Sequence, residues 1–187
     1  MKKSIITIAG ALGSGKSSTA KGVAEALGYQ HTSSGDLFRK IAKERGLSVE
    51  ALNLTAEQQK DIDYQVDEWL QKMGREENNF VIDSRLSFHW MPDSFKVYLS
   101  LDPQTAAERI FFHMKDAGRV SEDATTDEEV RASIDRRFAS EQKRYLDLYN
   151  VNPSDPSNFD LVIDTKDNDL KTVIHLVLDS YKKWLAT

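Results

Sequence analysis

The segment Gly10–Ser17 most constrains what this chain can fold into. It reads GALGSGKS, a complete match to the phosphate-binding pattern G-x-x-x-x-G-K-[ST]. An apolar run, Ile5–Ala9, precedes it, and a helical pattern that stops at Gly28 follows it. A fortuitous glycine-rich turn is the alternative, and the order strand, loop, helix argues against it. The chain is therefore expected to bind a polyphosphate at the end of a buried strand.

Each residue type in this loop has a physical reason to be there. Glycines let the backbone approach a polyphosphate closely, and the N–H groups and helix N-terminus attract its oxygens. Lys16 is expected to reach the β and γ phosphates of ATP, and Ser17 to ligate Mg²⁺. The other loop residues expected to bind ATP are Gly10, Gly13, Ser14, Gly15 and Ser18.

Composition and charge exclude several classes of protein. No stretch approaches the roughly 20 apolar residues that span a bilayer, and Met1 leads into the first strand without a signal-peptide pattern. The absence of cysteine excludes disulfides and thiolate metal sites. A net charge of -5 argues against a broad nucleic-acid surface. We expect a cytoplasmic monomer with neither membrane nor nucleic acid as partner.

Short apolar runs alternate with long helical patterns along the 187 residues. The runs are Ile5–Ala9, Tyr29–Thr32, Phe80–Ile82, Val97–Leu101 and Leu161–Ile163. This alternation predicts an α/β fold, with a mostly parallel sheet covered by helices on both faces and ligands bound at the carboxyl ends of the strands. No linker or repeat divides the chain, so a single domain is expected.

Capping patterns mark where several helices begin. Thr55-Ala-Glu-Gln58 and Thr126-Asp-Glu-Glu129 fit capping boxes, and Asp102 precedes a proline. The predicted helices cover about 56–73, 103–116 and 127–149. Residues 36–79 then form a helical insertion between the second and third strands, and residues 115–127 form a candidate lid.

Cations and a carboxylate follow the predicted strand ends. Arg39 and Arg85 lie where an acceptor phosphate could meet the loop, and arginine holds phosphate in bidentate fashion. Either arginine taken alone could instead be a surface charge. Asp83 ends the third strand and could hold Mg²⁺, with capping of the next element as the alternative.

A charged triplet lies on one side of the predicted 127–149 helix. Arg137, Glu141 and Arg144 are spaced i, i+4 and i+7, and Glu141 falls inside an apolar stripe. A carboxylate that faces the interior is costly unless it is paired, so Glu141 is expected to order the arginines or contact a ligand. A purely structural ion-pair cluster is the alternative.

Two further arginines lie in or near the candidate lid. Arg119 could close over the transferring phosphate, and Arg109 could stack on the ATP base. The alternatives are a solvated loop charge for Arg119 and an amphipathic surface role for Arg109.

These segments together resemble the cytidylate kinase family, particularly its shorter archaeal-type branch. The matching segments are Gly10–Ser17, Ser33–Arg39, Val81–Arg85, Arg137–Tyr145 and Leu161–Thr165. The resemblance implies a P-loop kinase fold with a five-stranded parallel sheet, a helical acceptor-binding insertion and a lid. It also implies phosphoryl transfer from Mg·ATP to a nucleoside monophosphate, CMP or dCMP.

The resemblance implies a role for each matching residue. Lys16 and Arg137 would act on the transferring phosphates, and Ser17 and Asp83 would serve Mg²⁺; a catalytic role for Arg119 rests on its place in the candidate lid alone. The implied acceptor-binding residues are Ser34, Arg39, Arg85, Glu141 and Arg144.

The chain also departs from the family's pattern. Ala11-Leu12 stand where the family often has two prolines, Ser84 stands where glycine is usual, and His113 stands where an arginine is frequent. Two interpretations compete with this one. The chain could be a kinase for another nucleotide or for a small metabolite, or it could be a nucleotide-binding regulator without catalysis.

Overall fold

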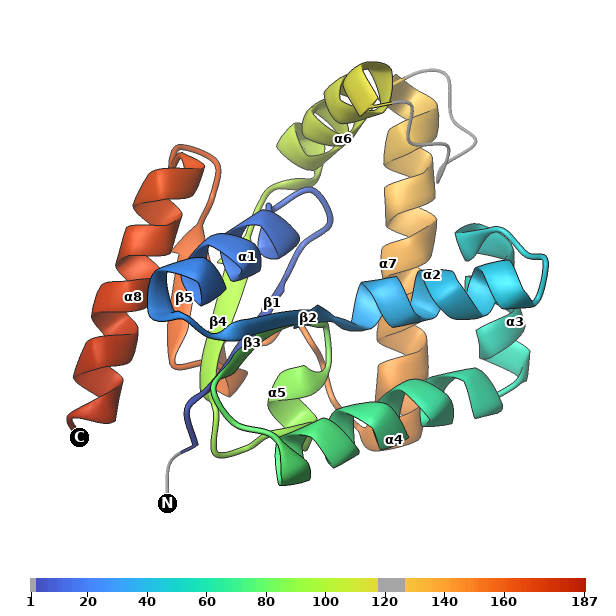
Figure 1. The fold of residues 1–187 in the computed structure, drawn as a ribbon. Helices are drawn as coiled ribbons and strands as arrows, with labels where there is room; N and C mark the ends of the chain where they lie inside the picture. Colours follow the sequence, from blue (N-terminus) through green and yellow to red (C-terminus); the bar gives the residue numbers. More distant parts are fainter. Residues whose placement is uncertain (1–2, 118–126) are drawn as a thin grey trace.

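The five apolar runs form one sheet in which every neighbouring pair of strands is parallel. The computed structural model describes residues 3–117 and 127–187 (Figure 1). The strands are β1 (Ile5–Gly10), β2 (Gln30–Ser33), β3 (Phe80–Asp83), β4 (Phe95–Ser100) and β5 (Leu161–Asp164). Their order in the sheet is β2-β3-β1-β4-β5, which confirms the predicted α/β class.

Helices connect the strands and cover both faces of the sheet. They are α1 (Lys16–Leu27), α2 (Ser34–Glu44), α3 (Val49–Gln58), α4 (Asp61–Glu76), α5 (Ser87–Trp90), α6 (Pro103–Ala117), α7 (Asp127–Tyr149) and α8 (Leu170–Leu185), with a short 3-10 helix at Pro156–Asn158. Figure 1 shows α2, α3 and α4 together beside α7. None of the described helices combines the length and the apolarity needed to cross a membrane. Most of the predicted lid, residues 118–126, lies outside the described residues.

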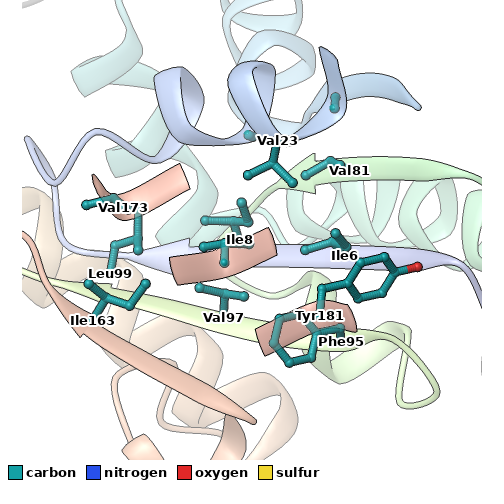
Figure 2. Packing of buried hydrophobic residues seen from close by; sticks show 13 residues of the cluster. Ile6, Ile8, Val23, Val81, Phe95, Val97, Leu99, Ile163, Val173 and Tyr181 are labelled. Atoms are coloured by element: carbon teal, nitrogen blue, oxygen red, sulfur yellow. The ribbon is translucent and has the colours of Figure 1, made fainter. Parts of the chain in front are cut away.

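Successive side chains of a strand point to opposite sides of the sheet. All six residues of the central strand β1 are buried, so both of its faces are covered. Ile6 and Ile8 pack with Val23 of α1 and Val173 of α8 in one core (Figure 2). Ile5 faces the other side, where the core includes residues of β3 and α4. Two packed layers therefore hold β1 rigidly, and with it the loop that follows.

The predicted helix over residues 56–73 is wrong at its start. Thr55 does not cap a helix: it lies inside α3, where its hydroxyl donates to the Ala51 carbonyl oxygen at 2.8 Å. The cap is Ser48, whose side chain accepts from the Ala51 N–H at 3.0 Å. The chain leaves the helix at Gln59, which is extended, and α4 begins at Asp61. One expected helix is therefore the end of one helix and most of a second.

Candidate functional site

The loop Gly10–Ser17 leaves the carboxyl end of β1 and turns directly into α1. Gly10 has φ +151°, and a Cβ there would lie 2.3 Å from the Leu99 carbonyl oxygen on β4. Gly15, immediately before α1, has φ +81°. Both positions therefore require glycine, the first for lack of space and the second for its left-handed backbone.

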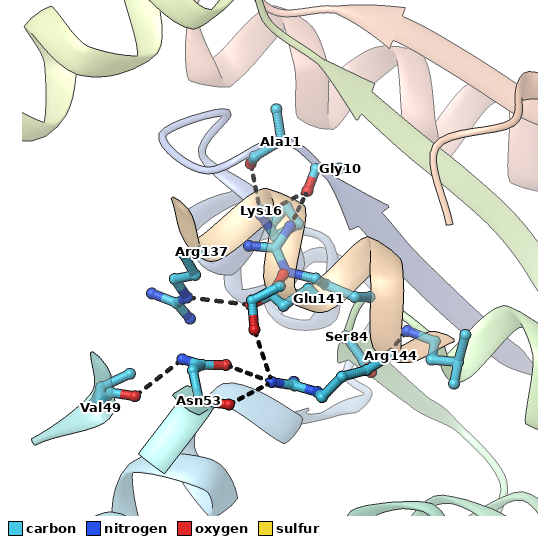
Figure 3. Close-up of polar contacts among 12 residues, drawn as sticks. Gly10, Ala11, Lys16, Val49, Asn53, Ser84, Arg137, Glu141 and Arg144 are labelled. Atoms are coloured by element: carbon cyan, nitrogen blue, oxygen red, sulfur yellow. Dashed lines mark hydrogen bonds and ion pairs between the residues drawn. The ribbon is translucent and has the colours of Figure 1, made fainter. Parts of the chain in front are cut away.

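Lys16 folds back over this loop. Its Nζ donates to the carbonyl oxygens of Gly10 at 3.0 Å and Ala11 at 2.6 Å (Figure 3). Desolvation, with a smaller contribution from the nearby Arg85 guanidinium, lowers the pKa of Lys16 to about 7. A polyphosphate bound beside the ammonium group would favour its charged form and raise that pKa.

Asp83 lies next to α1 at the end of β3, buried and held from three sides. Ser17 Oγ donates to Asp83 Oδ2 at 2.7 Å, and Ser33 Oγ donates to the same oxygen at 3.0 Å. His31 Nε2 lies 2.7 Å from Asp83 Oδ1. A hydroxyl and a carboxylate side by side are the hard oxygen donors that suit Mg²⁺, so Ser17 and Asp83 fit this cofactor.

Glu141 is at the centre of a second cluster and is only 6% exposed. It forms ion pairs with Arg85 and with Arg137, whose Nε lies 3.1 Å from Oε1. Arg85 also donates to the Gly10 carbonyl oxygen at 3.2 Å, which connects the cluster to the loop. Burial would raise the pKa of Glu141, but Arg85, Arg137 and Arg144 hold it below its ordinary value. The carboxylate thus faces inward and is paired, as its position on the helical wheel predicts.

Arg144 lies one turn further along α7 and ties three helices together. Its Nη1 donates to both the backbone and the side-chain oxygen of Asn53 on α3, each at 3.1 Å (Figure 3). Its Nε lies 3.0 Å from Asp63 Oδ2 on α4. Burial is the main cause that raises the pKa of Asp63 to about 6, against the opposing effect of Arg144.

One cavity of about 520 Å³ joins these clusters. The predicted site residues that line it are Gly13, Gly15, Lys16, Ser17, Ser18, Ser34, Arg39, Asp83, Arg85, Arg137, Glu141 and Arg144. Arg39 is half exposed and pairs with Asp36 at 2.6 Å, so its guanidinium is accessible to solvent. These predicted residues, from four separate segments of the chain, therefore meet at one hollow beside the loop.

Three other predicted residues, Gly10, Ser14 and Arg109, are not among the described residues that line this cavity, and a fourth is not placed. Arg109 donates to the carbonyl oxygens of Thr165 at 2.6 Å and Lys166 at 3.1 Å, after β5. Ser14 is buried, and its hydroxyl donates to the Ala11 carbonyl oxygen. Arg119 lies outside the described residues.

Sequence reasoning missed four polar residues of this region: His31, Asn53, Asp63 and Asp67. Asp63 and Asp67 share one face of α4 with Val66 and Leu70, and all four line the cavity. A carboxylate on an apolar helical face is the same signal that identified Glu141, so it was available for both aspartates. His31 and Asn53 carry no comparable signal, because their contacts depend on how separate elements pack.

The sequence matches known proteins over most of its length. A family model described as "Cytidylate kinase-like family" matches residues 5–167. The chain belongs to this family. It is 38% identical to a cytidylate kinase of Methanothrix thermoacetophila, covering 86% of this chain and 88% of that one. A cytidylate kinase of Haloarcula marismortui is 33% identical, covering 96% of this chain and 90% of its own.

A further relative and a solved structure extend the comparison. An S-adenosylmethionine-dependent nucleotide dehydratase of Lacinutrix mariniflava is 32% identical, over 97% of this chain and 36% of that protein. A shikimate kinase structure from Bacteroides thetaiotaomicron matches with a TM-score of 0.64 at 14% identity, covering 98% of both chains. The structural match shows the fold alone. The chain is thus a P-loop kinase related to archaeal cytidylate kinases.

Proposed function

We propose that this protein is a nucleoside monophosphate kinase that transfers the γ-phosphoryl group of ATP to CMP or dCMP. The observation that carries the proposal is that the phosphate-binding loop and Ser34, Arg39 and Arg85 line the same cavity. A two-substrate kinase needs donor and acceptor in one water-restricted space, and this cavity offers both sides.

The loop and α1 form the donor side of the proposed site. Lys16 and the loop amides would hold the β and γ phosphates of ATP. Ser17 and Asp83 would hold Mg²⁺, which when bound neutralises phosphate charge. Ser33 and His31 fix the Asp83 carboxylate through its two oxygens, so its position does not depend on the nucleotide.

The arginines form the acceptor side. Arg39 and Arg85 would hold the acceptor phosphate, one of whose oxygens attacks the γ-phosphorus of ATP. The bond from that phosphorus to the β–γ bridging oxygen breaks, which releases ADP and leaves a nucleoside diphosphate. An acceptor phosphate oxygen is already a nucleophile, so positioning and charge neutralisation supply the catalysis without a separate base.

Glu141 would orient two arginines, Arg85 and Arg137, toward the bound phosphates. Guanidinium has five N–H donors, so Arg85 and Arg137 can pair with Glu141 and still donate to phosphate oxygens. Three arginines, at 85, 137 and 144, face two carboxylates, Glu141 and Asp63. Over the whole lining of the cavity, five cationic side chains face four carboxylates, so the cavity keeps an excess of positive charge that suits phosphate-bearing substrates. We propose the same charge-stabilising role for Arg119, outside the described residues.

An acceptor panel tests this function. The purified protein is incubated with Mg·ATP and, in turn, CMP, dCMP, UMP, dTMP, AMP, GMP and shikimate, and ADP and the phosphorylated product are quantified. We expect CMP and dCMP to give the highest kcat/KM. Strong phosphorylation of another acceptor with none of CMP or dCMP would contradict the assignment. Nucleotide binding without acceptor-stimulated ADP formation would identify a regulator instead.

A further inference from the structure

Helix α4 packs into two separate cores, one at each end. Its first half, with Ile62, joins α2 and α3 in a small core that includes Ile41. Its second half, with Leu70, packs against β1 and β3. Val66 packs against both cores. Arg39 lies on α2, so the position of α4 on the sheet determines where the insertion holds Arg39.

Asp67 follows Val66 at the junction of these two halves and is 6% exposed. Trp90 Nε1 donates to Asp67 Oδ1 at 2.9 Å, and the Tyr149 hydroxyl donates to Oδ2. The rings of Trp90 and Tyr149 pack edge to face, with their centroids 5.4 Å apart and an interplanar angle of 82°. Because the two rings hold each other in place, both donors are already positioned for the carboxylate.

The two donors belong to segments that carry other parts of the site. Trp90 ends α5, the short helix that begins two residues after Arg85. Tyr149 ends α7, the helix that carries Glu141, the ion-pair partner of Arg85. Figure 1 shows α5 and the end of α7 beside α4. The Asp67 carboxylate therefore joins the insertion to both segments.

A carboxylate is a costly group for joining three helices. Two neutral groups, an indole N–H and a phenol hydroxyl, supply its hydrogen bonds. Burial raises the pKa of Asp67, against the opposing effects of the hydrogen bonds from Tyr149 and Trp90. An apolar side chain of similar volume would pack here without that penalty. Asp67 also lines the cavity, so the geometry that it fixes is that of the site.

We propose that Asp67 is a positioning residue, which through Trp90 and Tyr149 sets the distance between Arg39 on the insertion and Arg85 after β3. This inference rests on the proposed function, in which these two arginines hold the acceptor phosphate. The protein already uses both Asp67 oxygens, so the residue acts through its neighbours and not on the substrate. Without it, the insertion shifts relative to the sheet, and the acceptor phosphate is held less well and out of line with the donor.

The first test removes both hydrogen bonds. Asp67→Ala is expected to raise the KM for CMP by on the order of 10-fold and to lower kcat, with the KM for ATP within about 2-fold of wild type. A fold that is merely less stable would reduce the active fraction, and so the apparent kcat, without changing KM. The matched control is Asp61→Ala, which removes an exposed aspartate of the same helix that pairs with Arg45 at 2.9 Å. It should leave both KM values within about 2-fold.

Asp67→Asn separates the contacts from the charge. The amide oxygen of asparagine can accept from Trp90, and its amide nitrogen can donate to the Tyr149 hydroxyl oxygen. We therefore expect this variant to restore the KM for CMP to within about 3-fold of wild type. A KM as high as that of Asp67→Ala would mean that the charge is needed and not the contacts, and the proposal would be wrong.

A double-mutant cycle tests whether Tyr149 acts through Asp67. Tyr149→Phe keeps the ring and removes one donor, so the KM for CMP should rise about 3-fold or more in the otherwise wild-type protein. It should not rise further when Asp67→Ala is already present, because both changes break the same contact. Independent, additive effects would contradict the proposal. Tyr149→Phe and Asp67→Asn also keep it testable if Asp67→Ala does not fold.

The inference is overturned if Asp67→Ala, folded by its melting curve, retains the wild-type KM for CMP, or if Asp61→Ala raises this KM equally. Failure of the proposed function looks different: wild-type protein would not phosphorylate CMP at all. In that event the same comparison of KM values, made with the acceptor that the panel identifies, still tests Asp67.

Discussion

The pKa of Lys16 lies near neutral pH, so nucleotide binding at the proposed phosphate site should depend on pH. The pKa of Lys16 is lowered from its ordinary value to about 7, so its positive charge is present below pH 7 and is lost as the pH rises above it. Bound polyphosphate favours the charged form and raises the pKa again. Binding above pH 7 therefore takes up a proton.

We predict that the Kd for Mg·ATP increases at least about 10-fold between about pH 6 and pH 9, with an inflection near 7. Titration calorimetry in buffers of different ionisation enthalpy measures both the Kd and the proton uptake. Lys16→Arg is the control, because a guanidinium stays charged throughout this range. The same inflection in Lys16→Arg would exclude Lys16 as its source.

Individual residues were predictable where a local pattern carried the signal. Glu141 stood out as a carboxylate within the apolar stripe of its helix, and it is buried and paired. Asp63 carried the same signal on α4 and was overlooked. The contact of Arg144 with Asn53 spans 91 residues of sequence, and no local periodicity encodes which two helices approach each other.

At the scale of elements, helix α2 carries two adjacent cationic side chains, of which one lines the cavity and the other does not. Arg39 lines the cavity, whereas Lys40 is exposed and lies near Glu44 on the same helix. Arg39→Ala should raise the KM for CMP and lower kcat, by roughly 10-fold or more in kcat/KM, with ATP binding unchanged. Steady-state kinetics with each substrate varied in turn measures this.

Lys40→Ala removes an equal charge from the same helix and controls for the net charge of α2. It should leave both KM values within about 2-fold, because exposed ion pairs of this kind contribute little. An Arg39→Ala variant that responds to CMP as wild type does would remove Arg39 from the site.

Element boundaries were the least predictable feature of the insertion. The break between α3 and α4 falls at Gln59-Lys60, a pair without the glycine or proline that usually marks a helix end. Thr55 fits a capping box by sequence, yet it lies within a helix that Ser48 has already capped. Packing of Leu52, Ala56 and Ile62 in one small core, rather than local chemistry, fixes where the two helices part.

At the scale of the whole molecule, the sequence predicted the class of fold but not the arrangement of its strands. Apolar runs between helical patterns are enough to indicate a parallel sheet with covered faces. The order β2-β3-β1-β4-β5 depends on pairings between strands far apart in the sequence, such as β1 with β3 and β4. The family resemblance, rather than periodicity, supplied the expectation of five strands.

The cavity is lined by residues from many parts of the chain, so a ligand bound there should stabilise the folded state of the whole protein against unfolding. A ligand at 100 times its Kd adds about 2.7 kcal/mol to the free energy of unfolding, which corresponds to roughly 5–10 °C in Tm for a chain of this size. We expect shifts of that order with Mg and a non-hydrolysable ATP analogue, and separately with CMP, by differential scanning fluorimetry.

Lys16→Ala separates the two contributions to this stabilisation. It should lose most of the shift caused by the ATP analogue and keep the shift caused by CMP, because Lys16 lies in the loop proposed to bind the donor. Equal loss of both shifts would mean that the variant disturbs the fold rather than the donor site.

The contacts of the Arg144 guanidinium should couple the binding of the two nucleotides. It joins α7 to both α3 and α4, and α7 also carries Arg137 and Glu141 toward the loop. We expect a change in the position of the insertion to be transmitted through α7 to the proposed donor side. Occupancy by either nucleotide should then alter the affinity for the other, and thermodynamic reciprocity requires the two effects to be equal.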